Sequence, residues 1–147
     1  MASMLDSGED QKVLDWLAEA DFSHQHNEHL KKHQEGTGQW LLASAKFRSW
    51  VEGTKQMLFC PGHPGAGKTT LAAAVIHHLR GSPMLQSPSV GLAYIYFSFW
   101  QREQQIAEDL LANLARQLAQ GRPSLPANLR DLYLRHKTKH GHLLTRS

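Results

Sequence analysis

The chain has 147 residues, 41% of them hydrophobic and 20% charged, which is the size and composition of one ordinary globular domain. Its net charge of +3 is a mild bias, and its single cysteine, Cys60, excludes an internal disulfide. No apolar run approaches the roughly 20 residues of a membrane-spanning helix, and the acidic start MASMLDSGEDQKVLDW lacks the apolar core of a secretory signal. We therefore expect a cytoplasmic protein with no membrane partner.

The N-terminal third of the chain is predicted to be helical with one polar interruption. A helix begins near Ser7, a candidate cap, and carries an apolar stripe as far as Ala20. Residues 21–36 are polar and favour a linker with at most a marginal helical turn. A second amphipathic helix is expected over residues 40–51. We group residues 1–53 as an N-terminal helical and linker segment with two helices.

From residue 54 onward the pattern alternates between strands and helices. The expected strands are residues 56–60 and 91–100, and the expected helices are residues 69–79, 103–120 and 127–137. A strand, a helix and another strand in this order predict a parallel pair with a right-handed crossover. The predicted fold class is therefore α/β, with a P-loop NTPase-type parallel sheet in residues 54–147. The sheet is incomplete, since only two strands are evident and two parallel strands leave long unpaired edges.

A phosphate-binding motif lies between the first predicted strand and the helix that follows it. The stretch GHPGAGKT, residues 62–69, fits G-x-x-x-x-G-K-[ST] without a mismatch. A polyphosphate is wrapped by backbone N–H groups that point inward, in conformations that glycine permits, and the N-terminus of a helix favours an anion. Lys68 can reach the β- and γ-phosphates as a point charge, and the hydroxyl of Thr69 can bind Mg²⁺.

The sequence therefore predicts a site for ATP or GTP with Mg²⁺. The motif reads phosphates rather than the base, so it does not choose between the two nucleotides. The predicted nucleotide-binding residues are Gly62, His63, Pro64, Gly65, Ala66, Gly67, Lys68, Thr69 and Thr70.

Hydrolysis is not expected, and no catalytic residue is predicted. P-loop NTPases also use an acidic residue at the end of a second strand to hold Mg²⁺. The acidic residues after Lys68 are Glu103, Glu108, Asp109 and Asp131, and none directly follows an apolar strand. Glu103 comes closest, although a place at the start of a helix already explains an acid there.

Other groups of polar and aromatic residues favour structural roles. The histidines between residues 24 and 33 could be set at metal-ligand spacing, but a polar linker is the preferred interpretation. The basic C-terminal stretch, residues 130–147, favours a solvated helix end over a nucleic-acid arm. Cys60 is expected to face the core of its strand, and the four tryptophans are expected to be core anchors.

Six segments that follow one another in order carry a family resemblance. They are VLDWL (13–17), HQEGTGQWLLAS (33–44), FCPGHPGAGKTTLAA (59–73), AYIYF (93–97), LLANLARQLAQ (110–120) and RPSLPANLRDLYLRH (122–136). Together they resemble the nucleotide-binding segment of fungal NACHT proteins, specifically the nephrocystin-3-like N-terminal domain. Those proteins are STAND-type NTPases, often continued by repeats.

The resemblance implies a nucleotide site with its P-loop at residues 62–69. It also implies that residues 35–42 pack near the nucleotide base, with Thr37 or Gly38 as base contacts. In the family the next strand ends in two acids, a motif that this sequence does not contain, so a truncated domain is implied.

Two functions therefore remain open. The chain is a nucleotide-binding part of a NACHT-type signalling NTPase, or it is an interaction fragment with a vestigial nucleotide site. In the second case its strand edges and basic tail would bind a full-length relative or a second copy. A small P-loop kinase is disfavoured, because no lid or acceptor-site pattern is visible.

Overall fold

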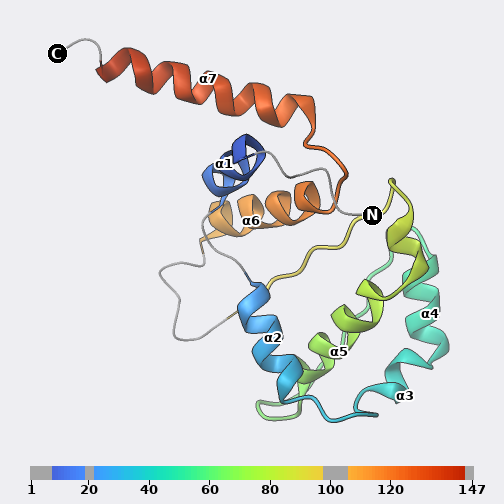
Figure 1. Ribbon diagram of the computed structural model, residues 1–147. Coiled ribbons are helices and arrows are strands. Elements are labelled where there is room, and N and C mark those ends of the chain that lie inside the picture. The colour runs from blue at the N-terminus through green and yellow to red at the C-terminus, as the bar shows by residue number, and fades with distance from the viewer. Residues whose placement is uncertain (1–7, 19–21, 98–105, 145–147) are drawn as a thin grey trace. The chain divides into compact units, whose positions relative to one another are not determined.

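The computed structural model describes residues 8–18, 22–97 and 106–144, with side chains described as far as residue 139. In these ranges the secondary structure is entirely helical (Figure 1). The helices are α1 (Gly8–Leu17), α2 (Ser23–Lys31), α3 (Gln39–Leu42), α4 (Ala45–Glu52), α5 (Lys68–Arg80), the short 3-10 helix η1 (Pro83–Gln86), α6 (Ala107–Gln120) and α7 (Ala127–Leu144). The chain forms two compact units: unit 1 is Met1–Asp21 with Pro88–Ser147, and unit 2 is Phe22–Ser87.

The predicted α/β sheet is wrong for this structure, since the described residues contain no β-strand. Both segments expected to be strands run as non-helical chain, residues 56–60 in unit 2 and residues 91–97 in unit 1, while residues 98–100 lie outside the described ranges. A strand is defined by hydrogen bonds to a neighbouring strand, and neither segment has such a ladder. The expectation of two helices before the first strand is also wrong, because four precede residue 56.

Unit 1 is organised around α1, which contacts both α6 and α7 (Figure 1). Its buried core cluster combines Val13 and Leu14 of α1, Ala119 of α6 and Leu125 of the turn before α7. Apolar residues spaced at helical intervals on α1 place these side chains on one face, as the sequence predicted. Trp16 extends the contact, with its ring centroid 5.5 Å from that of Tyr133 in α7.

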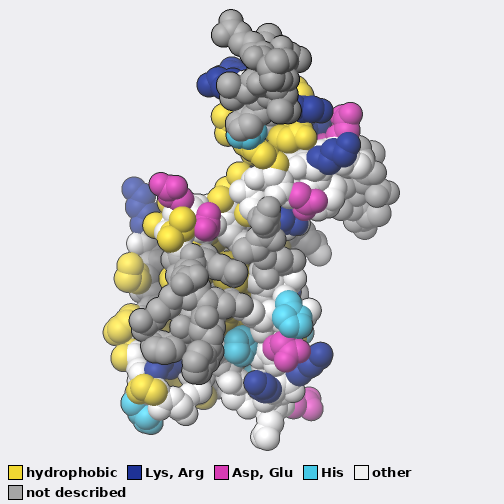
Figure 2. Space-filling model, turned by 90° about the vertical axis from the view of Figure 1, so that its left-hand side faces the viewer, with side chains coloured by type: hydrophobic (Ala, Val, Ile, Leu, Met, Phe, Trp, Pro, Cys, Tyr) yellow, Lys and Arg dark blue, Asp and Glu magenta, His cyan; other side chains and the backbone are white. Residues whose placement is uncertain are grey.

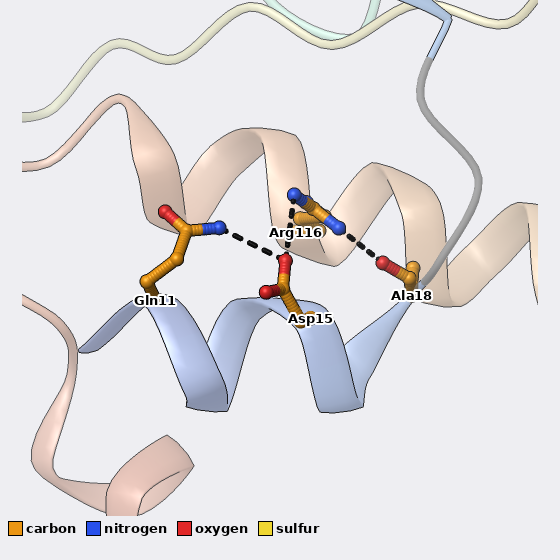
Figure 3. A network of polar contacts seen from close by, with 4 residues as sticks. All are labelled: Gln11, Asp15, Ala18 and Arg116. Carbon is orange, nitrogen blue, oxygen red and sulfur yellow. Dashed lines mark hydrogen bonds and ion pairs between the residues drawn. The ribbon is translucent and has the colours of Figure 1, made fainter. Parts of the chain in front are cut away.

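A polar network joins the outer side of α1 to α6 (Figure 3). Arg116 of α6 pairs with Asp15 of α1, with Nη2 and Oδ1 3.2 Å apart, and also donates to the carbonyl oxygen of Ala18. Gln11 donates to the same carboxylate oxygen of Asp15 at 2.9 Å. The guanidinium is mostly buried whereas the carboxylate is mostly exposed. This network therefore fixes the direction of α6 along α1 more than it stabilises the unit.

A side chain replaces the missing neighbour of the second expected strand. The amide of Gln117 accepts a hydrogen bond from the backbone N–H of Tyr94 at 3.0 Å and donates to its carbonyl oxygen at 2.8 Å. In an extended chain the N–H and C=O of one residue point to the same edge. Gln117 therefore bonds both backbone groups of Tyr94, as a neighbouring strand would, but no sheet is formed.

Replacing Gln117 with Ala is expected to loosen the segment around Tyr94. Two hydrogen bonds of about 1 kcal/mol each correspond to a loss of protection of about 30-fold at the Tyr94 amide. Hydrogen exchange measured residue by residue tests this, with Gln120→Ala, an exposed position on the same helix, as the control. Equal protection of Tyr94 in both variants would contradict the role given to Gln117.

Unit 2 differs from the sequence prediction in its first half. Residues 23–31, expected to belong to a linker, form α2, which packs against α5. The helix expected over residues 40–51 is two helices, because Ser44 starts a new one. Its hydroxyl accepts from the backbone N–H of Phe47 at 3.1 Å, the usual geometry of an N-cap. The core of this unit gathers Phe22, Leu41, Phe47, Ala73, Ala74 and Ile76.

Candidate functional site

The predicted phosphate loop links the extended segment 56–60 to the N-terminus of α5 in unit 2. Gly65 has φ +85° and Gly67 has φ +90°, the left-handed region that side chains disfavour. No neighbouring atom lies within 4 Å of where a Cβ would be at either position. Backbone conformation and not crowding is therefore the reason that these two positions require glycine.

The first turn of α5 presents free backbone donors. Its N-cap is Gly67, which has no side chain to bond to the amides of that turn. The helical ladder starts with the N–H of Leu71, which donates to the carbonyl oxygen of Gly67 at 2.9 Å. The amides of Lys68, Thr69 and Thr70 come before that bond and are donors without a helical partner. A helix end of this kind attracts an anion through its N–H groups and its dipole.

The side chain of Lys68 folds back over the loop that precedes it. Its Nζ donates to the carbonyl oxygen of Gly62 and, at 2.8 Å, to that of His63. The loop is closed further by the N–H of Ala66, which donates to the carbonyl oxygen of His63 at 3.1 Å. The ammonium group of Lys68 is thus held beside the loop and is exposed to solvent. The exposed ammonium group is therefore near enough to the loop to be a partner for an anion bound there.

The hydroxyl of Thr69 is the proposed magnesium ligand, and it is exposed at the start of α5. In the described parts of the chain, no three His, Cys, Asp or Glu side chains come together as a metal site. A magnesium ion at Thr69 would therefore take most of its oxygen ligands from phosphate and water, as Mg²⁺ does in nucleotide sites. Glu103, the alternative ligand, lies outside the described residues, and Glu108 and Asp109 lie in the first turn of α6.

The segment expected near the nucleotide base lies against the same helix that begins at the loop. Gly38 is buried with φ +83°, and a Cβ there would be 3.2 Å from Cδ1 of Leu71 and 3.4 Å from Cβ of Ala74. Leu71 is one turn beyond Lys68 on α5. Thr37 is exposed beside this contact, and its carbonyl oxygen is 2.8 Å from Nε2 of His33. The structure therefore places this segment next to the first turns of α5.

Three expectations about individual side chains are wrong. Cys60 is exposed and does not face a core, because its segment has no sheet to pack in. Trp40 is 71% exposed, so it is no core anchor, and Trp100 lies outside the described residues. His26, assigned to a polar linker, is buried in α2. Its spacing from Phe22 and Leu30 was the only signal of a buried helical face, and the polar residues between them obscured it.

The extended segment before the loop carries the most exposed apolar side chains of unit 2. Met57 is 90% exposed and Phe59 80% exposed, and alternate residues of an extended chain share one face. Figure 2 shows hydrophobic side chains at the surface that it draws. No backbone–backbone hydrogen bond ties residues 57–60 to another described segment. The segment therefore presents apolar side chains to solvent and pairs with no other described strand.

Comparison with known proteins identifies a family for most of the chain. In the described ranges no helix has the length and apolar character needed to cross a bilayer. Neither the curated proteins nor the solved structures include a match to this chain. A family model, described as Nephrocystin 3, N-terminal, matches residues 36–146, which include the whole phosphate loop, α5, α6 and all but the end of the C-terminal region. Because this match covers well over half of the sequence, the chain belongs to the nephrocystin-3 N-terminal family.

Proposed function

We propose that this chain binds a nucleotide, ATP or GTP, together with Mg²⁺, through the loop Gly62–Thr69. The observation that carries the proposal is the loop's entry into α5 through two left-handed glycines and an uncapped first turn. This arrangement offers several amide donors to one anion, which suits a polyphosphate better than a carboxylate. In this proposal the chain is the nucleotide-binding part of a NACHT-type or STAND-type signalling NTPase.

Each residue of the loop has a role in this proposal. Gly65 and Gly67 shape the loop, and their amides bind phosphate oxygens together with the amides of residues 68–70, while the N–H of Ala66 keeps its bond to His63. Lys68 moves its ammonium group from the carbonyls of Gly62 and His63 to the β- and γ-phosphates. The hydroxyl of Thr69 binds Mg²⁺. His63, Pro64 and Ala66 occupy variable positions of the motif and contribute backbone only.

Binding is proposed without hydrolysis. Phosphate contacts hold a nucleotide, whereas hydrolysis also needs an acid that fixes Mg²⁺ and a group that orients the attacking water. Beyond Lys68 the sequence has four acidic residues, and two of them, Glu108 and Asp109, are exposed in the first turn of α6, where they complement the helix dipole. No residue of this sequence is therefore assigned a catalytic role.

Isothermal titration of the full chain with Mg-ATP, and separately with Mg-GTP, tests the proposal. Saturable heat is expected with at least one triphosphate. AMP is the matched control, because it keeps the base and sugar but lacks the β- and γ-phosphates that Lys68 would contact, and it should bind at least ten times more weakly. The absence of heat at millimolar triphosphate, or equal affinity for AMP, would contradict a phosphate-reading site.

A second candidate function is favoured by the exposed segment before the loop. Met57 and Phe59 lie on an extended chain whose backbone groups are open to another strand, and proteins use such edges for β-strand addition. Here the nucleotide site would be vestigial, and the chain would associate with a full-length relative. A chain that gives no heat with triphosphates yet co-elutes with that relative in gel filtration would favour this second function.

A further inference from the structure

A histidine forms the buried face of α2, an otherwise polar helix. His26 is 1% exposed, and it is the only buried residue within Ser23–Lys31. The helix that α2 packs against is α5, the helix that begins at the phosphate loop (Figure 1). Both helices belong to unit 2. The one buried side chain of the helix that contacts α5 is therefore an imidazole, a group whose charge changes near neutral pH.

Burial and the charged groups that act on His26 favour its neutral form. The charges that act on it belong to Arg80 and His77 of α5 and to His29 of α2 itself. Arg80 is always charged, and neither histidine can offer a negative charge. Burial is the largest effect, and together with these cationic neighbours it lowers the pKa of His26 below the ordinary value of 6.5. A proton on His26 would place a new cation in a buried contact that already faces positive charge.

We propose that protonation of His26 releases α2 from α5, so that this contact is an acid-sensitive clasp on the helix of the phosphate loop. The α2 side of the clasp, with His26, lies outside the family match, which begins at residue 36, whereas the α5 side lies within it. The proposal does not depend on whether the loop binds a nucleotide. Its action would be to free one side of α5 when the surrounding pH falls.

The direction of the pH effect follows from linkage between protonation and packing. Released α2 carries a histidine with a pKa near 6.5, and packed α2 carries one with a lower pKa. Above 6.5 both forms are neutral, so the contact is fully stable. As the pH falls below 6.5, release takes up a proton and becomes more favourable by up to about tenfold per pH unit. The effect levels off once the pH passes below the pKa of the packed form.

Hydrogen exchange of the full chain at pH 7.5 and pH 5.5 tests the clasp. After correction for the intrinsic exchange rate at each pH, the protection of α2 amides should fall by up to about tenfold at the lower pH. The variant His26→Gln should show a ratio near one, because glutamine does not titrate. The matched control His24→Gln removes an exposed histidine of the same helix and should keep the pH effect. An unchanged pH effect in His26→Gln would overturn the proposal.

A second measurement keeps the test decisive if His26→Gln no longer packs against α5 at either pH. The ring proton signals of His26 in the unchanged chain are followed by NMR from pH 8 to pH 5. The proposal expects a titration below 6.5 that coincides with the loss of α2 protection. A ring that titrates at 6.5 or above, or one that titrates while α2 stays protected, would overturn it.

Discussion

Replacing Lys68 with Ala is expected to weaken triphosphate binding by about 100-fold. In the proposed site its ammonium group contacts two phosphates, and hydrogen bonds to charged groups contribute about 1.5–3 kcal/mol. A loss near 3 kcal/mol corresponds to a change of about 150-fold in the dissociation constant. Titration with Mg-ATP or Mg-GTP, whichever binds the unchanged chain, measures the effect. The affinity for AMP should change little, because AMP lacks the phosphates that Lys68 reaches.

The same substitution is expected to leave the fold intact, which makes a loss of binding interpretable. In the structure Lys68 is exposed, and its partners are the exposed carbonyls of Gly62 and His63, which water can satisfy after the change. The free energy of unfolding should therefore change by no more than about 0.5 kcal/mol. Lys46→Ala, an exposed lysine of α4, is the control that should keep normal affinity. Unchanged triphosphate affinity in Lys68→Ala would refute the site.

The sequence predicted the loop and its helix well because both depend on local features. The motif requires a helix directly after its glycines, and α5 begins at Lys68, one residue before the predicted start. Glycines at 62, 65 and 67 were expected to take conformations closed to other residues. Gly65 and Gly67 have positive φ, whereas Gly62 does not. The long apolar stripe of α6 was also recognised, and its helix ends at Gln120 as expected.

The sheet could not be predicted from sequence in the same way, because pairing is not a local property. The segments at residues 56–60 and 91–97 have strand composition, but a strand exists only when another strand satisfies its edge. In unit 1 that edge is met at Tyr94 by the side chain of Gln117, 23 positions away in the sequence. No sequence pattern indicates that a side chain will take the place of a neighbouring strand. Composition therefore predicted two strands that the described residues do not form.

The missed helix α2 has a different explanation. Its residues are polar, and one buried position, His26, forms the face that packs on α5. Periodicity finds helices by their apolar residues, so a helix that packs through a histidine gives almost no signal. A helix this short depends for most of its stability on tertiary contact, here with α5. His26, the polar residue at the buried position of α2, is also the residue on which the acid-sensitive clasp depends.

Replacing Phe47 with Ala is expected to destabilise unit 2 by about 3–5 kcal/mol, the usual cost of deleting a buried aromatic ring. Phe47 is 3% exposed, and its ring centroid lies 5.7 Å from those of Trp50 in α4 and His78 in α5. The ring thus links α4 to the helix of the phosphate loop. Urea unfolding followed by circular dichroism measures the loss. Trp40→Ala removes a larger ring that is 71% exposed and should cost less than about 1 kcal/mol.

The two variants with the largest predicted effects distinguish a loss of triphosphate binding from a loss of stability, both at α5. Lys68→Ala should lose triphosphate affinity with normal stability, since it removes a charge from the surface of the N-terminus of α5. Phe47→Ala should lose stability first, and any loss of affinity should disappear at temperatures low enough to keep unit 2 folded, because its ring touches α5 far along the helix at His78. Equal stability of Phe47→Ala and Trp40→Ala would contradict the support that the ring contact between Phe47 and His78 is proposed to give α5.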